Sequence, residues 1–203
     1  MGNRLQGHNY GYTEARKTPL GNKMTGYPVI PENLKIRWQR WEQSLPAEVT
    51  TRRPLAPYQQ PVISTELHVF GDASTYGVGA AVYSVVNQED GINQTLVAAK
   101  ARLAKRELTV PRLELISAHM AINLVINIRN ALKELPVPMI YGWLDSTVAL
   151  HWIVGNGQYR QFVSNRAQKV RQYPQIQWRH VPTTDNPADL ASQGSQVTNA
   201  ELW

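Results

Sequence analysis

The chain contains no cysteine among its 203 residues. It therefore has no disulfide framework, no thiol nucleophile and no cysteine-based zinc site. It also lacks any run of about 18 apolar residues, so we expect no transmembrane helix and no membrane partner. Residues 1–12 have no apolar core, so we expect no secretory signal there. Together these absences predict an intracellular protein.

Acidic residues are scarce in the first third of the chain. Residues 1–65 hold nine Lys and Arg against four Asp and Glu, whereas residues 66–203 hold twelve against eleven. The formal net charge of +6 therefore comes mostly from the N-terminal part. A basic balance favours a polyanionic partner such as nucleic acid, although it also serves solubility.

The N-terminal part has little periodic pattern apart from one helix. We expect residues 1–62 to form an extension or connecting segment, with a short amphipathic helix at about 32–45. Four prolines in residues 46–62 indicate a linker. One face of the predicted helix is apolar and carries Leu34, Trp38, Trp41 and Leu45. We expect this face to pack on the parent domain or on a neighbouring domain rather than on nucleic acid.

The rest of the chain predicts an α/β domain over residues 63–195, followed by a tail at 196–203. Residues 67–85 predict a hairpin whose first strand ends at Asp72. The pattern then predicts a strand, a helix, a strand, two helices, a strand and a helix. Their expected ranges are 95–103, 111–135, 139–144, 146–154, 161–172, 175–181 and 186–193. This order is typical of a five-stranded mixed sheet with helices on both faces.

Small residues dominate the second strand of the hairpin. Gly77, Gly79, Ala80 and Ala81 keep the side chains short there. We therefore expect another backbone or a ligand to approach this strand closely.

Four acidic residues stand out by position. Asp72 and Asp145 each lie at the end of a predicted strand, Glu114 lies in the first turns of the long helix, and Asp189 lies in the last helix. If the first and fourth strands are parallel neighbours, Asp72 and Asp145 lie at the same edge of the sheet, where open α/β sheets bind ligands.

Carboxylates that converge without cations repel one another. Divalent cations with oxygen ligands compensate for that repulsion, and magnesium binds such ligands alongside substrate phosphates. Two metal ions about 3.5–4 Å apart activate a water and stabilise the leaving oxygen of a phosphodiester. The pattern therefore predicts hydrolysis of a nucleic-acid backbone.

Each acidic residue also has an ordinary explanation when it is taken alone. Asp145 can cap the following helix, and Glu114 can interact with a helix dipole. Asp189 can be a surface residue. The order and topology of all four weaken these separate explanations.

Four motifs together resemble the ribonuclease H domain of retroelement polyproteins, and most of all that of BEL/Pao long-terminal-repeat retrotransposons. They are VFGDAS, TVPRLELISA, GWLDSTVALHWI and WRHVPTTDNPADLASQG, and they span about residues 66–194. The segment PENLKIRWQRWEQSLP also resembles the stretch that joins reverse transcriptase to ribonuclease H in those polyproteins.

The resemblance implies a ribonuclease H-like fold and an endonuclease that cuts the RNA strand of RNA–DNA hybrids during reverse transcription, leaving 3′-hydroxyl and 5′-phosphate ends. It implies that Asp72, Glu114, Asp145 and Asp189 are the catalytic and metal-binding residues, with two magnesium or manganese ions. The implied partners are the hybrid and a reverse transcriptase domain. The implied location is the cytoplasm, virus-like particles or the nucleus.

Two features depart from many cellular ribonucleases H. The loop before Asp189 is short, and the histidine near it is His180. His180 is expected to be either a proton shuttle or simply a strand residue. A basic protrusion after the second helix is not evident. For substrate contact we consider residues close to the acids: Ser74, Ser146, Thr147, Asn186 and Arg112. Two groups of basic residues, within 100–112 and 160–171, are expected either to contact substrate or to form solvated faces.

Two other functions stay open. An inactive ribonuclease H-like module would bind nucleic acid or a polymerase domain without cutting, and the intact acidic residues argue against it. A DNA nuclease of the same fold would cut duplex or branched DNA, and the DAS, RLEL and LDS contexts argue against it.

Overall fold

The computed structural model of the chain describes residues 30–45, 47, 55–56, 58, 60–133 and 137–193. The chain divides into two units, Met1–Ala47 and Glu48–Trp203. In the first unit, helix α1 (Glu32–Ser44) follows Pro31, and the rings of Trp38 and Trp41 pack with their centroids 4.9 Å apart. Packing of this helix on the parent domain or on a neighbouring domain stays a prediction, as do the domain boundaries.

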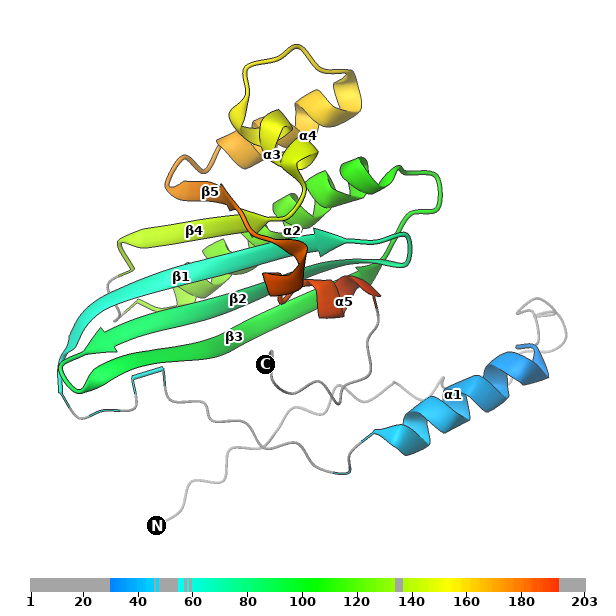
Figure 1. Cartoon of the computed structure of the whole chain (residues 1–203), viewed down its shortest axis with the longest axis horizontal. Coiled ribbons are helices and arrows are strands. Elements are labelled where there is room, and N and C mark those ends of the chain that lie inside the picture. The colour runs from blue at the N-terminus through cyan, green and yellow to red at the C-terminus, as the bar shows by residue number, and fades with distance from the viewer. Residues whose placement is uncertain are drawn as a thin grey trace, which may run out of the picture. The chain divides into compact units, whose positions relative to one another are not determined.

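The second unit is built on a five-stranded sheet with the order β3-β2-β1-β4-β5 (Figure 1). Strands β1 (Val62–Ala73), β2 (Gly77–Gln88) and β3 (Gly91–Leu103) form an antiparallel meander. Strands β4 (Met139–Leu144) and β5 (Ile176–His180) run parallel to β1. The predicted mixed sheet is confirmed.

Helices cover both faces of this sheet, as predicted. They are α2 (Val110–Ala131), α3 (Thr147–Val154), α4 (Gln161–Arg171) and α5 (Asp189–Gln193), with a 3₁₀ turn at Thr183–Asp185. Neighbouring residues of a strand point to opposite faces. A Cβ atom on Gly71 would meet Ser117 of α2, whereas one on Gly79 would meet Ala191 of α5. The two helices therefore lie on opposite faces, and the main core lies under α2.

Several predicted boundaries are wrong. The hairpin extends beyond 67–85, because β1 begins at Val62 and β2 ends at Gln88, and β1 ends at Ala73 rather than at Asp72. Strand β3 begins at Gly91 rather than at 95, because ladder pairing extends through polar residues up to the pair Gln88–Gly91. Helix α2 ends at Ala131 rather than at 135. The last helix begins at Asp189 rather than at 186, because Asn186 is held extended before Pro187.

No helix among the described residues has the length and apolarity that crossing a membrane requires.

Candidate metal centre

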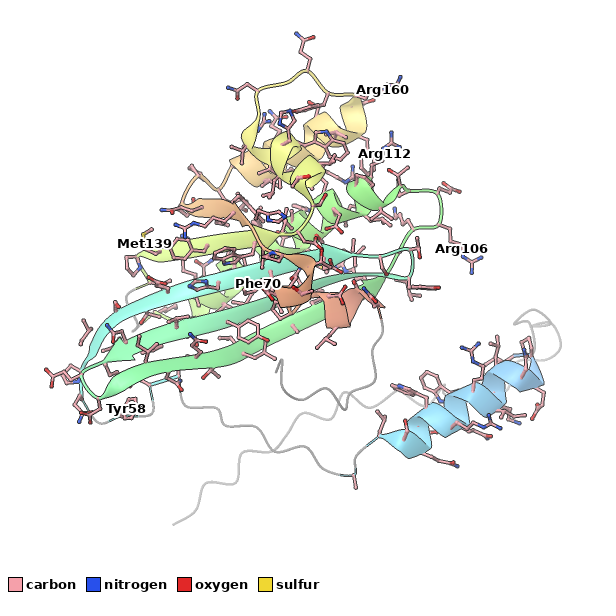
Figure 2. All side chains as sticks on the ribbon, viewed as in Figure 1. Tyr58, Phe70, Arg106, Arg112, Met139 and Arg160 are labelled. Carbon is pink, nitrogen blue, oxygen red and sulfur yellow. The ribbon has the colours of Figure 1, made fainter. Side chains whose placement is uncertain are left out.

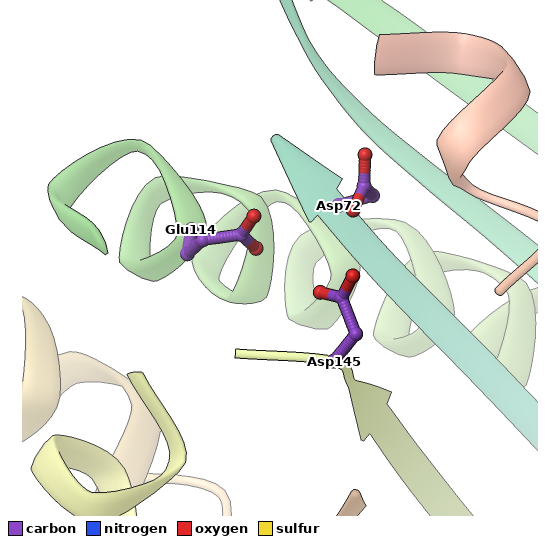
Figure 3. A group of neighbouring side chains, drawn as sticks. All are labelled: Asp72, Glu114 and Asp145. Atoms are coloured by element: carbon purple, nitrogen blue, oxygen red, sulfur yellow. The ribbon is translucent and has the colours of Figure 1, made fainter. Parts of the chain in front are cut away.

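The site forms where β1 and β4 end. These strands are parallel neighbours, and Gly71 pairs with Leu144. Asp72 follows Gly71 and Asp145 follows Leu144, so the two aspartates lie at the same edge of the sheet, as the sequence predicts. Glu114 reaches them from the first turns of α2 (Figure 3). Each of the three side chains offers a carboxylate oxygen, and these oxygens all lie within 4.8 Å of one another.

One oxygen of each carboxylate is held by a hydrogen bond. The backbone N–H of Ala73 donates to Glu114 Oε1 over 3.1 Å. The hydroxyl of Thr183 donates to Asp145 Oδ2 over 2.9 Å, and the hydroxyl of Ser192 donates to Asp72 Oδ2. These contacts fix the orientation of the carboxylates without neutralising their charge.

Two further oxygens of the cluster, Glu114 Oε2 and Asp145 Oδ1, are buried and have no hydrogen-bond partner. Unpartnered buried polar atoms are rare, because losing water without a replacement costs about 1–3 kcal/mol or more. Carboxylate oxygens are the ligands that magnesium and manganese prefer. The donor set and its unpartnered oxygens therefore fit hard divalent cations.

Burial makes this cluster hard to ionise without a cation. Asp72 and Glu114 are only 4% and 5% exposed. Burial, aided by the charges of the neighbouring carboxylates, raises the pKa of Asp72 to about 6 and the pKa of Glu114 to about 9. In the metal-free protein at neutral pH, Glu114 is therefore protonated.

Asp189 lies beside the cluster rather than in it. It is the first residue of α5 and is half-buried, and its charge contributes to the raised pKa of Asp72. Its Oδ1 accepts a hydrogen bond from Gln193. The structure thus brings three of the four predicted acidic residues together and places the fourth next to them.

The close packing of α5 on β2 depends on glycine. A Cβ atom on Gly79 would lie 2.7 Å from the backbone oxygen of Ala188, and one on Gly77 would lie 2.7 Å from that of Ser192. The expected close approach of another backbone to this strand is confirmed. Through it, α5 carries both Asp189 and Ser192 to the site.

Replacing Gly79 by alanine should therefore displace α5. We expect a loss of about 1–3 kcal/mol of stability, which is typical of overpacking. A thermal melt should show a decrease of several degrees. Gly157→Ala is the comparison with a milder expected effect, because the three atoms nearest to its new Cβ atom all belong to the far end of the Tyr159 side chain and not to the backbone. An unchanged melting temperature for Gly79→Ala would contradict this packing.

Two hydroxyl residues at the site, Ser192 and Thr183, were not found by sequence reasoning. Ser192 lies three residues after Asp189, so the two share a helix face, which is the one signal that could have pointed to it. The bond from Thr183 to Asp145 spans 38 residues and depends on where β5 ends.

Three of the predicted substrate residues make bonds within the fold. The hydroxyl of Ser74 donates to Ser192 O over 2.7 Å. The hydroxyl of Ser146 caps α3 by accepting from Ala149 N. The side chain of Asn186 is 3% exposed and donates to Gly71 O. In contrast, Thr147 is exposed and Arg112 is half-buried, and both lie in the first turn of a helix.

His180 is the last residue of β5 and is exposed. One of its ring nitrogens lies 3.2 Å from the backbone oxygen of Asp145. It is thus a strand residue near the site, and its action as a proton shuttle stays a prediction.

Comparisons with known proteins give one family. The model of the Pao retrotransposon-like RNaseH-like domain matches residues 22–146. The matched range includes Asp72, Glu114 and Asp145 and ends before Asp189. A search of curated proteins found no match.

Several solved structures are similar to the chain. The N-terminal RNase H domain of a Mycobacterium tuberculosis protein, solved as a fusion with maltose-binding protein, is 14% identical with a TM-score of 0.46, over 64% of this chain and 93% of that one. RNase H1 of Halobacterium salinarum is 18% identical with a TM-score of 0.43, over 64% and 95%. LC11 RNase H1 in complex with an RNA/DNA hybrid is 14% identical with a TM-score of 0.44, over 65% and 96%.

Proposed function

Because this chain belongs to the family of Pao retrotransposon-like RNaseH-like domains, we propose that it is a metal-dependent endonuclease that cuts the RNA strand of RNA–DNA hybrids. The observation that carries the proposal is the cluster of Asp72, Glu114 and Asp145, whose ligand oxygens lie within 4.8 Å of one another. The biological setting that we propose is reverse transcription of a retroelement, with a reverse transcriptase domain as the partner that presents the hybrid.

We assign metal binding to Asp72, Glu114, Asp145 and Asp189, with two magnesium or manganese ions. When bound, such ions supply an activated water and stabilise the leaving oxygen of a phosphodiester. Glu114 and Asp145 are suited to this role because each has one oxygen held by a hydrogen bond and the other free of hydrogen-bond partners. Asp72 is held by Ser192 of α5, and Asp189 adds a fourth negative charge beside it.

For the substrate, we propose that Thr147 and Arg112 contact the hybrid directly. Thr147 lies two residues after Asp145 in the chain and is exposed at the start of α3. Arg112 lies two residues before Glu114 on α2. We propose that Ser74, Ser146 and Asn186 act by shaping the backbone around the site, because their polar atoms already have partners there.

The proposal is tested with a labelled RNA–DNA hybrid, single-stranded RNA and duplex DNA, each incubated with magnesium, manganese or EDTA. We expect metal-dependent cutting of the RNA strand of the hybrid alone. Cutting of duplex DNA would favour a DNA nuclease instead. A folded protein that binds the hybrid but cuts none of the substrates would favour an inactive binding module.

A further inference from the structure

Ser192 lies on the side of the sheet to which the side chain of Asp72 points. Asp72 pairs with Gly79 across β1 and β2, and directly opposed residues of two antiparallel strands share a face. A Cβ atom on Gly79 would meet α5, so Asp72 also faces α5. Figure 2 labels Phe70, which lies two residues before Asp72 and shares this face. Glu114, in contrast, reaches the cluster from α2, on the opposite face of the sheet.

The hydroxyl of Ser192 is a buried donor with a carboxylate as its partner. Ser192 is 1% exposed, and its hydroxyl donates to Asp72 Oδ2. The backbone oxygen of Asp189 is a second acceptor, at 3.1 Å. A hydroxyl has one proton to donate, and a hydrogen bond to a charged acceptor is roughly twice as strong as one to a neutral acceptor. When Asp72 is ionised, the bond to its carboxylate is therefore the stronger of the two.

The turn between β1 and β2 fixes the backbone of Ser192. The hydroxyl of Ser74 donates to the backbone oxygen of Ser192 over 2.7 Å. The same hydroxyl accepts from the backbone N–H groups of Tyr76 and Gly77 over 3.0 and 3.2 Å. A Cβ atom on Gly77 would lie 2.7 Å from the Ser192 oxygen, so the turn packs directly against it. The turn therefore holds Ser192, and Ser192 in turn holds Asp72.

Two hydroxyls hold carboxylates of the cluster, and that of Ser192 is the buried one. Thr183 donates to Asp145 but is exposed, so water can take over its bond if the hydroxyl is removed. Ser192 and Asp72 are 1% and 4% exposed. Because water reaches a buried acceptor poorly, the loss of a buried donor is not readily replaced. The orientation of Asp72 therefore depends on Ser192 more than that of Asp145 depends on Thr183.

We propose that Ser192 is a positioning residue of the metal centre, whose hydroxyl holds the Asp72 carboxylate in the orientation in which it binds a divalent cation. This inference rests on the metal centre of the proposed function. Ser192 acts through Asp72 and does not itself contact the metal or the hybrid. Hydrogen-bond partners of metal ligands typically contribute about 10–100-fold to metal affinity, because a ligand that is already oriented loses less freedom on binding.

The test measures the melting temperature of the full chain as a function of magnesium or manganese concentration, with EDTA as the reference. The ions are the only ligands added. Ser192→Ala should bind both ions about 10–100-fold more weakly than the unmodified chain. The control is Ser84→Ala, which removes another fully buried hydroxyl, one that donates to the backbone oxygen of Thr95 on β3. The affinity of this control should stay within about twofold.

A purely structural role for Ser192 predicts a different result. The loss of a bond that only supports the fold would lower the melting temperature in EDTA and leave its dependence on ion concentration unchanged. That result, or an ion affinity equal to that of the unmodified chain, would overturn the proposal. Ser192→Thr keeps a hydroxyl at this position, so it should bind the ions more tightly than Ser192→Ala does.

The positioning proposal and the proposed function fail differently, because ion binding is measured without nucleic acid. If the unmodified chain cuts the hybrid but Ser192→Ala binds the ions just as tightly, the positioning proposal is wrong and the proposed function stands. If the unmodified chain cuts nothing but Ser192→Ala binds the ions more weakly than it does, the positioning proposal stands and the proposed function is wrong.

Discussion

Asp145→Asn is expected to lower the rate of hybrid cleavage at least about a thousandfold, which corresponds to about 4 kcal/mol of transition-state stabilisation. The reason is local. The substitution removes one negative charge from a cluster whose ligand oxygens lie within 4.8 Å, and it replaces a buried carboxylate oxygen that has no hydrogen-bond partner. An amide binds divalent cations more weakly than a carboxylate does.

The fold should survive this change. Asparagine keeps the shape of the side chain, and an acceptor for the hydroxyl of Thr183 remains. Removing one of several like charges should leave the metal-free stability equal or higher. The matched control is Asp185→Asn, an exposed acidic residue in the neighbouring 3₁₀ turn. A near-normal rate for Asp145→Asn, measured beside this control, would contradict the assigned metal centre.

The stabilisation of the domain by magnesium is expected to grow steeply with pH. In the metal-free protein, burial raises the pKa of Glu114 from its ordinary 4.5 to about 9, and that of Asp72 from 3.8 to about 6. Between the ordinary and the raised values, the folded state holds protons that the unfolded chain has lost. The stability of the metal-free protein should therefore fall as pH rises from about 4 to about 9.

Bound magnesium requires ionised carboxylates, so it must displace these protons. Each displaced proton makes the apparent affinity increase up to about tenfold per pH unit. Between pH 6 and 8, displacement of the Glu114 proton alone should therefore raise the affinity up to about a hundredfold.

The measurement is the shift in melting temperature at fixed magnesium at pH 6, 7 and 8, with EDTA as the reference at each pH. The shift should be largest at pH 8. The control is Glu114→Gln, which removes the proton that has to be displaced and should flatten the pH dependence. A shift of equal size at all three pH values would mean that Glu114 is already ionised in the metal-free protein.

The sequence was sufficient to predict the sheet edge where the site lies. Two predicted strands each ended at an aspartate, and the rule for parallel neighbours placed Asp72 and Asp145 together, which the register of β1 and β4 confirms. Glu114 could not be placed in the site from the local pattern alone, because an acidic residue near a helix N-terminus can simply interact with the helix dipole. Its inclusion in the site needed either the resemblance or the structure.

Other features depend on contacts that no local pattern contains. The hydrogen bond from Ser192 to Asp72 joins residues 120 apart in the chain. In the sequence, Arg166 is part of what resembles an ordinary charged helix face, and its stacking on Phe162 is not evident there. The early start of β3 also cannot be predicted from the local sequence, because a polar edge strand resembles a loop until the strand that it pairs with is known.

The most direct test of the central claim is the chemistry of the ends that cleavage leaves on the RNA strand. The proposed ribonuclease H activity predicts 3′-hydroxyl and 5′-phosphate ends, formed from the hybrid only when a divalent cation is present. Products that end in 2′,3′-cyclic phosphate and 5′-hydroxyl, or cutting that continues in EDTA, would show that the carboxylate cluster of this domain does not carry out the reaction.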